Sequence, residues 1–256
     1  MKNLKIKHII EKIGINLSDV FGDKNKILGS AASLTNIKKN QFTFCKEKNI
    51  DKLNDINDCV IIAPKSIKYN LKTNNTYIIV NNPRLIFARI MKLIYPQYIP
   101  PSIYIGKNVI IEKTTIIGSD GFAFERNEKG EFEKFSQIGG VIIEDNVEIQ
   151  GLSNVDRGTI DNTIIKEGTK IDTFCHIAHN TQIGKHCDIR AKAMIGGSVI
   201  IKDYVTIAPC VSIINGITIG RNSFIGMGSV VTKNVPDGFI FFGVPAKKIR
   251  INDYEF

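Results

Sequence analysis

The sequence predicts a β-class protein, a left-handed parallel β-helix of hexapeptide repeats preceded by a small N-terminal α/β domain. Three observations support this prediction. An aliphatic residue recurs at every sixth position, a small or β-branched residue follows four places later, and the first hundred residues show a different pattern. These patterns predict an N-terminal domain over 1–97, a β-helix over 98–235, and a C-terminal loop and tail over 236–256.

The repeat is longest in the second half of the chain. Twelve aliphatic residues succeed one another at a spacing of six, without a miss, from Ile165 to Val231. A period of six fits neither the 3.6 residues of a helical turn nor the alternation of a flat strand. It is typical of a chain that turns a corner every six residues, so that three sides make a triangular coil of 18. Stacked coils then pair as parallel strands about 4.8 Å apart.

The small positions of the repeat include Cys175 and Cys187, which we interpret as packing residues because these positions point into the coil. Five cysteines without a CxxC pair predict neither a disulfide framework nor a zinc site, and we expect no bound metal. Two segments, 119–140 and 156–164, break the period. Breaks in a solenoid are typically loops on a functional face.

Before the repeats, the chain predicts alternating helices and strands. An amphipathic helix is expected to open the chain and to end at Gly14. A second helix is expected with Asn82 as N-cap and Pro83 as its first residue. The prolines of 95–101 then predict a stiff linker. The strand-like runs between the helices are Phe42 to Cys45, Cys59 to Ala63 and Tyr77 to Val80.

The net charge of +9 fits either an acidic partner or a lysine-rich composition with solvated side chains. No basic run is interleaved with aromatic residues, so nucleic acid is not an expected partner. No apolar run reaches the roughly 18 residues of a membrane span, and the opening helix lacks the continuous apolar core of a signal peptide. We therefore expect a cytoplasmic protein.

Three histidines of the repeat region point outward by their place in the hexad. His179 differs from the others because Gly197 follows it by 18 residues, one full coil, and so lies directly above it. An imidazole beside uncovered backbone suits acyl transfer, because it can deprotonate an attacking amine while an N–H stabilises the oxyanion. The same spacing also fits glycines that merely ease a corner. The three histidines are His176, His179 and His186.

Several segments resemble the UDP-3-O-acylglucosamine N-acyltransferases of lipid A synthesis. The resemblance implies that His179 is the general base and that Gly197 supplies the oxyanion N–H. It further implies that Asp172 and Asn180 bind the substrate and that Phe44 stacks on the nucleotide base. The segments are SDGF (119–122), QIGGVIIEDNVEI (137–149), DRGTIDNTII (156–165), IDTFCHIAHNTQIG (171–184), QFTF (41–44) and NNPRLIFARIM (81–91).

The chain also departs from that family's pattern. It lacks several coils before SDGF, and it lacks the C-terminal helices. A family histidine of the acyl-carrier region would fall near Gly216, and a tyrosine that accompanies the stacking aromatic is replaced near Ile50. These departures bear on the length of the acyl chain and on the identity of the acyl donor.

The chain ends in GVPAKKIR (243–250), which resembles the terminal loop of hexapeptide acetyltransferases. That loop lies against coenzyme A in those enzymes. The resemblance implies that Gly243, Pro245, Lys247 and Lys248 bind an acyl-CoA.

The predicted function is an N-acyltransferase that moves a short acyl group, acetyl from acetyl-CoA first of all, to the amine of a nucleotide-linked amino sugar for surface glycans. A homotrimer is expected, because an outward His179 needs a covering wall. The lipid A enzyme with a hydroxyacyl carrier protein as donor is the principal alternative. A silent scaffold and a metal enzyme with a histidine trio across a subunit interface, as in some carbonic anhydrases, are the others.

Overall fold

The structure is a computed structural model that describes residues 4–67 and 74–253. The chain forms two compact units. One comprises Met1–Ile99 with Ala123–Ser136, and the other comprises Pro100–Phe122 with Gln137–Phe256. This division differs from the expected boundaries chiefly at the long break in the repeat, because the middle of that break belongs to the N-terminal unit and not to the β-helix. The C-terminal segment, expected as a separate part, belongs to the β-helix unit.

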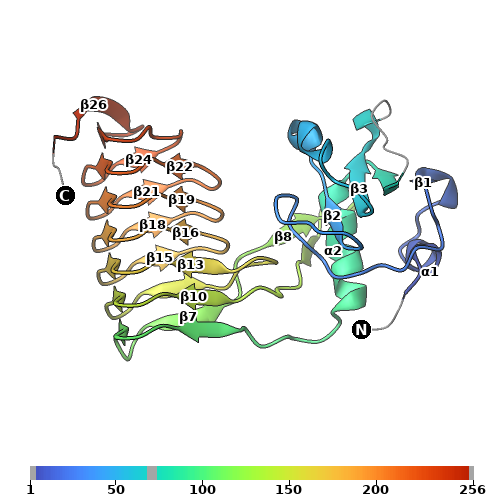
Figure 1. The fold of residues 1–256 in the computed structure, drawn as a ribbon, viewed down its shortest axis with the longest axis horizontal. Coiled ribbons are helices and arrows are strands. Elements are labelled where there is room, and N and C mark those ends of the chain that lie inside the picture. Colours follow the sequence, from blue (N-terminus) through green and yellow to red (C-terminus); the bar gives the residue numbers. More distant parts are fainter. Residues whose placement is uncertain (1–3, 68–73, 254–256) are drawn as a thin grey trace. The chain divides into compact units, whose positions relative to one another are not determined.

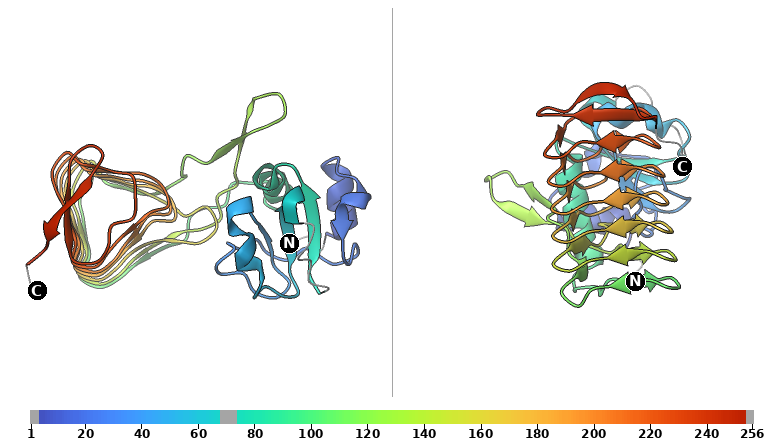
Figure 2. Two further views of the ribbon diagram at one scale, coloured as in Figure 1. Left: turned by 90° about the horizontal axis from the view of Figure 1, so that it is seen from above. Right: turned by 90° about the vertical axis from the view of Figure 1, so that its left-hand side faces the viewer.

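The larger unit is a solenoid of stacked coils (Figure 1), and each coil is triangular when seen along the stack (Figure 2). Its three sides are three parallel sheets, closed at one end by a short hairpin. The first sheet contains β5 (Ile103–Ile105), β10 (Val141–Ile143), β13 (Thr163–Ile165), β16 (Gln182–Ile183), β19 (Ile200–Ile201) and β22 (Thr218–Ile219). The second contains β6 (Ile110–Ile111), β11 (Glu148–Ile149), β14 (Lys170–Ile171), β17 (Asp188–Ile189), β20 (Thr206–Ile207), β23 (Phe224–Ile225), β25 (Phe239–Phe242) and β26 (Lys247–Ile251). The third contains β7 (Ile116–Ser119), β12 (Asn154–Asp156), β15 (His176–Ile177), β18 (Met194–Ile195), β21 (Ser212–Ile213) and β24 (Val230–Val231).

The hexad aliphatic residues form the solenoid core. Ile165 pairs with Ile183, and Ile183 pairs with Ile201, so the register advances by 18 residues per coil. Cys175 and Cys187 are buried in the same core, where burial raises the pKa of each thiol to about 11. Both cysteines are therefore packing residues, as predicted.

The corners of the coils require a backbone conformation that the repeat pattern does not reveal. Phe174, Asn180, His186 and Lys192 follow at six-residue intervals, each with φ between 52° and 61°. Non-glycine residues seldom adopt this left-handed region. Here each corner is held by the neighbouring coil, as where the N–H of Ser198 donates to the carbonyl of His179 at 2.8 Å.

Both breaks in the repeat lie at the same corner as His179. This corner, which we name the histidine corner, links the third sheet to the first. A 21-residue excursion between β7 and β10, residues 120–140, is named the insert. The histidine corner consists of the two ends of the insert, 120–122 and 137–140, and of residues 157–162, 178–181, 196–199 and 214–217.

The N-terminal unit contains a four-stranded sheet in the order β1, β4, β3, β2, in which β2, β3 and β4 are parallel and β1 is antiparallel to β4. The α/β prediction is thus confirmed. The Asn82 side chain accepts a hydrogen bond from the Leu85 N–H at 3.1 Å, as expected of an N-cap. The elements are α1 (Ile6–Lys12), β1 (Val20–Phe21), β2 (Phe42–Phe44), β3 (Val60–Pro64), β4 (Thr76–Val80) and α2 (Pro83–Ile94), with short 3-10 helices at Leu17–Asp19, Glu47–Leu53 and Lys65–Ile67.

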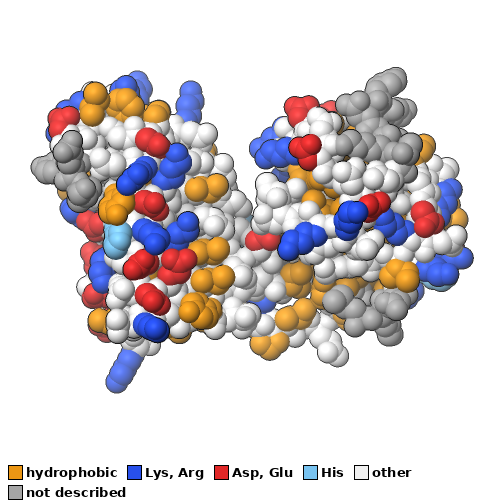
Figure 3. Space-filling view, in the orientation of Figure 1, with side chains coloured by type: hydrophobic (Ala, Val, Ile, Leu, Met, Phe, Trp, Pro, Cys, Tyr) orange, Lys and Arg blue, Asp and Glu red, His pale blue; other side chains and the backbone are white. Residues whose placement is uncertain are grey.

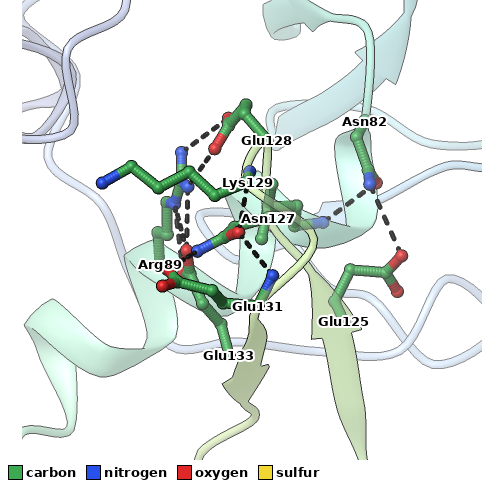
Figure 4. A network of polar contacts seen from close by, with 9 residues as sticks. Asn82, Arg89, Glu125, Asn127, Glu128, Lys129, Glu131 and Glu133 are labelled. Carbon is green, nitrogen blue, oxygen red and sulfur yellow. Dashed lines mark hydrogen bonds and ion pairs between the residues drawn. The ribbon is translucent and has the colours of Figure 1, made fainter.

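The middle of the insert is a hairpin of β8 (Phe124–Arg126) and β9 (Phe132–Lys134) that packs on α2. Arg89 of α2 reaches Glu128 at 2.7 Å and Glu133 at 2.8 Å (Figure 4). The hydrogen bonds of Arg89 lower the pKa of both carboxyls. These ion pairs explain why the hairpin belongs to the N-terminal unit.

The C-terminal segment, expected as a loop and tail, forms the β25–β26 hairpin instead. β25 continues the second sheet beside β23, and β26 returns antiparallel to it. The Phe242 ring covers the backbone of Gly226, where a Cβ would lie 1.9 Å from Cδ2 of the ring. The hairpin therefore covers one end of the second sheet.

Acidic and basic side chains are interspersed on the solenoid face seen in Figure 3. The net charge of +9 is thus not gathered into one patch on that face. Over the described ranges 4–67 and 74–253, no helix has the length and apolar character needed to cross a membrane.

Candidate active site

His179 follows β15 at the histidine corner, and its imidazole lies between two glycines. A Cβ added at Gly197 would lie 2.8 Å from both Cε1 and Nε2 of the ring. A Cβ added at Gly121 would lie 2.7 Å from His179 Cβ and 2.9 Å from Cδ2. The coil stacking predicted from the sequence thus places Gly197 against His179, and a side chain at either glycine position would displace the imidazole.

Asn180 holds the imidazole from its other nitrogen. The Asn180 Oδ1 lies 3.0 Å from His179 Nδ1 and also accepts the N–H of Thr159 at 3.0 Å. The Asn180 amide donates from Nδ2 to the Asp161 carbonyl at 3.1 Å, which fixes the orientation of the amide. Because Oδ1 can only accept, Nδ1 of the neutral imidazole carries the hydrogen and Nε2 carries the lone pair.

Asn180 therefore contacts the candidate base itself, a role that the substrate-binding expectation did not include. The sequence could have indicated this contact, because Asn180 directly follows His179 and both lie at a predicted corner of the coil.

We expected from the sequence that the backbone N–H of Gly197 would be uncovered, but in the structure a side chain covers it. It donates to Oδ1 of Asn215 at 3.1 Å. Asn215 lies 18 residues after Gly197, so the same stacking rule, applied once more, would have found it. An oxyanion can accept this N–H only after the Asn215 amide has turned away.

Asp172 lies at a different corner, which links the second sheet to the third. Its carboxylate accepts the N–H of Thr173 at 2.6 Å and the N–H of Ala191 at 3.1 Å. It thereby joins two successive coils. Within this solenoid, the structure does not bring Asp172 to the corner that holds His179.

The other two histidines of the solenoid have separate surroundings. His176 Nε2 lies 3.7 Å from Asp156 Oδ2, and the His186 ring stacks on Tyr204 at 5.3 Å between centroids. Across residues 4–67 and 74–253, no three or more His, Cys, Asp or Glu side chains form a group that could hold a metal ion. A histidine trio is therefore not assembled within this solenoid.

Phe44 is the last residue of β2 and is partly buried, with its ring 5.0 Å from that of Phe87. Ile50, near the position where the resemblance implies a tyrosine, packs against a buried cluster. Burial lowers the pKa of Lys46, and the charge of Arg84 lowers it further. Lys46, two residues after Phe44, thus lies near other cationic side chains, and the sequence reasoning missed it.

A cavity of about 350 Å³ occupies another part of the same unit, lined among others by Lys65 and Asn82, and Phe44 does not line it. It lies where β3 and β4 end and α2 begins, the edge at which open α/β sheets commonly bind ligands.

The expected coenzyme-binding residues lie in and before β26. Gly243 has φ of 101°, which favours glycine, and Pro245 follows in the turn. Lys247 and Lys248 are successive strand residues, so their side chains point to opposite faces. The Lys248 ammonium lies 3.5 Å from the centroid of the Phe239 ring. The two lysines therefore do not converge on one phosphate.

Comparison with known proteins bears on the fold and on the family resemblance. The bacterial transferase hexapeptide family (six repeats) matches residues 162–197. UDP-3-O-acylglucosamine N-acyltransferase of Methylobacterium nodulans is 44% identical over 146 residues, which cover 57% of this chain and 41% of that protein. The Campylobacter lari enzyme of the same name is 29% identical over 300 residues, covering 94% of this chain and 93% of its own.

The solved structure of Arabidopsis UDP-N-acetylglucosamine acyltransferase is 20% identical, with a TM-score of 0.55 over 83% of this chain and 60% of that one. It confirms the left-handed β-helix fold. The matched region spans well under half the length of the first of these curated relatives. The resemblance inferred from the motifs is nevertheless confirmed, and the chain is a hexapeptide-repeat β-helix protein similar to the UDP-3-O-acylglucosamine N-acyltransferases.

Proposed function

We propose that this protein transfers an acyl group to the amine of a nucleotide-linked amino sugar, with His179 as general base. The observation that carries the proposal is the geometry of the imidazole. Asn180 holds Nδ1, Gly197 lies against Nε2, and no side chain intervenes. A neutral histidine with a free Nε2 is the form that accepts a proton from an attacking amine.

The reaction then proceeds by addition and elimination. The amine nitrogen attacks the thioester carbonyl carbon while Nε2 of His179 takes one amine proton. The carbonyl oxygen becomes an oxyanion, which accepts the N–H of Gly197 once Asn215 releases it. Collapse of the tetrahedral intermediate forms the amide and breaks the carbon–sulfur bond, and the imidazolium returns its proton to the leaving thiolate.

For the substrates, we propose UDP-3-O-acylglucosamine as acceptor and a hydroxyacyl carrier protein as donor. Two curated relatives bear the name of that acceptor, and one of them aligns over nearly the whole of both chains. The net charge of +9 suits an acidic carrier protein. The opposed directions of Lys247 and Lys248 give less support to coenzyme A.

A short acyl-CoA remains the second candidate donor, with a nucleotide-linked amino sugar as acceptor. The turn at Gly243 and Pro245, between β25 and β26, supports this candidate through the resemblance of its sequence to a coenzyme-binding loop. This candidate is the one that the sequence favoured.

The experiment that tests these proposals is a donor-by-acceptor assay. The purified protein is incubated with UDP-3-O-acylglucosamine, or with UDP- and dTDP-linked amino sugars, and with hydroxyacyl carrier protein, acetyl-CoA or propionyl-CoA. Amide formation is followed by mass spectrometry. We expect turnover with the carrier protein and UDP-3-O-acylglucosamine. Turnover only with the CoA thioesters would contradict that donor, and no product from any combination would contradict the proposed function.

We also propose a homotrimer. Apolar side chains of Met194, Ile200 and Ile214, each 45–48% exposed, flank the histidine corner on its outward side. A neighbouring solenoid would cover them and supply a wall for the site. Multi-angle light scattering at micromolar concentration is expected to give three times the chain mass of 28.5 kDa. A monomer mass would contradict the assembly.

Phe44→Ala is expected to raise the KM for the nucleotide sugar roughly tenfold or more and to leave the donor KM unchanged, because stacking on a base contributes about 1–3 kcal/mol. Steady-state kinetics with each substrate varied in turn measures both constants. Lys65→Ala is the matched control, because Lys65 lines the cavity that Phe44 does not reach. A folded Phe44→Ala protein with unchanged kinetics, or an equal effect of Lys65→Ala, would contradict the assignment of Phe44.

A further inference from the structure

Two motifs that the proposed mechanism leaves unused, SDGF and DRG, interlock at the histidine corner. Ser119 Oγ donates to Asp156 Oδ1 at 2.8 Å. The N–H of Arg157 donates to the carbonyl of Ser119 at 2.8 Å. Residues almost forty positions apart are thus joined by both backbone and side chain.

The Arg157 side chain closes the base of the insert. It is 0% exposed, the largest of the fully buried side chains. Its Nε donates to the Gly139 carbonyl at 2.7 Å, and its Nη1 lies 3.8 Å from Asp120 Oδ1. Asp120 is where the insert leaves the solenoid, and Gly139 is where it returns. A buried guanidinium is tolerated only when it is paired in this way, and its removal leaves the partly buried Asp120 carboxylate without its counter-charge.

The position of Gly121 follows from that of Asp120, the residue before it. Gly121 lies against Cβ and Cδ2 of His179, whereas Gly197 lies against Cε1 and Nε2. The imidazole is thus confined on two sides by backbone, and Asn180 holds Nδ1. Of the two confining glycines, Gly197 is placed by the regular stacking of coils. Gly121 lies in the irregular insert, and Arg157 is the side chain that ties both ends of that insert.

We propose that Arg157 is a positioning residue for His179. Through Asp120 and Gly139 it holds the backbone of Gly121 against the imidazole, and this contact keeps Nε2 directed at Gly197. The inference rests on the proposed function, because it assigns Arg157 to the same site. A purely structural role, in which Arg157 only anchors the insert, makes a different prediction for the imidazole.

The test observes the imidazole itself. Protein labelled with ¹⁵N and ¹³C in its four histidines is studied by NMR, which reports the tautomer of each ring. In the wild-type protein we expect His179 in the Nδ1–H form. In Arg157→Lys, whose shorter reach cannot span Asp120 and Gly139, we expect the His179 resonances to shift and the Nδ1–H preference to weaken. His186, at another corner, should be unaffected.

Two further variants keep the test independent of folding defects. Gly121→Ala leaves the buried charges intact and places a Cβ 2.7 Å from His179 Cβ, so it should shift the same resonances. Arg190→Lys is the matched control, because Arg190 pairs with Asp188 on the outward side of the second sheet, about half exposed. It should leave the His179 resonances unchanged.

Kinetics on the same variants complete the test. Arg157→Lys and Gly121→Ala should lower kcat about 100-fold, since a small misplacement of a catalytic group has an effect of that size. The KM for the nucleotide sugar should stay within about threefold, as expected when only the transition state is affected. Unchanged His179 resonances in either folded variant would overturn the proposal, even if Tm fell. Failure of the wild-type protein to transfer any acyl group would refute the proposed function, and the NMR result would still decide whether Arg157 positions His179.

Discussion

Replacing His179 with alanine is expected to lower kcat by about 10²–10⁴-fold, the contribution typical of a general base, with little change in KM. The imidazole is confined by Gly121 and Gly197 and is oriented by Asn180. Gly121 and Gly197, the two residues against the imidazole, have no side chains that could replace it as a base. Without the imidazole the amine must lose its proton to solvent while it attacks the carbonyl. The decrease in rate therefore falls on the chemical step, which is why kcat changes and KM does not.

The measurement is a comparison of kcat and KM for wild type, His179→Ala and His179→Asn with the donor that supports turnover. His186→Ala is the matched control, because His186 is also a corner residue but stacks on Tyr204 at a different corner. His176, whose ring lies beside Asp156, should also matter less. A His179→Ala enzyme within about threefold of wild type would overturn the mechanism, since a general base typically contributes at least about 100-fold.

Gly197→Ala is expected to lower kcat by about 10²–10³-fold, the effect of losing one oxyanion donor. The added Cβ would lie 2.8 Å from Cε1 and Nε2 of His179, so the ring has to move. The same methyl group would cover the N–H that the oxyanion is proposed to accept. The φ angle of Gly197 is outside the left-handed region, so the backbone itself accepts alanine.

Gly151→Ala is the matched control for this variant. Gly151 lies in the same solenoid between the second and third sheets, and its added Cβ would lie 2.6 Å from the Thr114 hydroxyl, a contact as close as that at Gly197 but away from His179. Thermal unfolding should show both variants folded. Gly151→Ala should keep the kcat of the wild-type protein. A fully active Gly197→Ala protein would show that neither the Gly197 N–H nor the position of the His179 ring contributes to catalysis.

Much of the fold follows from the sequence because the solenoid obeys a local rule. A residue six positions on occupies the same place on the next side, and a residue 18 positions on lies in the next coil. Burial of the hexad aliphatic residues therefore places Gly197 over His179 without any knowledge of distant contacts. The α2 helix was predictable for the same reason, since Asn82 and Pro83 act within one turn of it.

Only the tertiary structure decided which polar groups pair around the imidazole, because pairing depends on competition for hydrogen bonds and on packing between distant segments. Asn215 covers the Gly197 N–H because a buried donor requires an acceptor, and the period of the repeat carries no information on which side chain provides it. Asn180 turns to His179 because its amide is also held by Thr159 and Asp161.

Residues 123–136 joined the N-terminal unit because ion pairs with Arg89 draw the hairpin onto α2, across more than thirty residues of sequence. Lys247 and Lys248 point apart because the tail pairs as a strand, which requires the partner β25. The sequence by itself thus determined the repeating frame and the place of the candidate base within it. Only the tertiary structure decided how the groups around that base are paired, because pairing depends on which polar groups packing brings within reach.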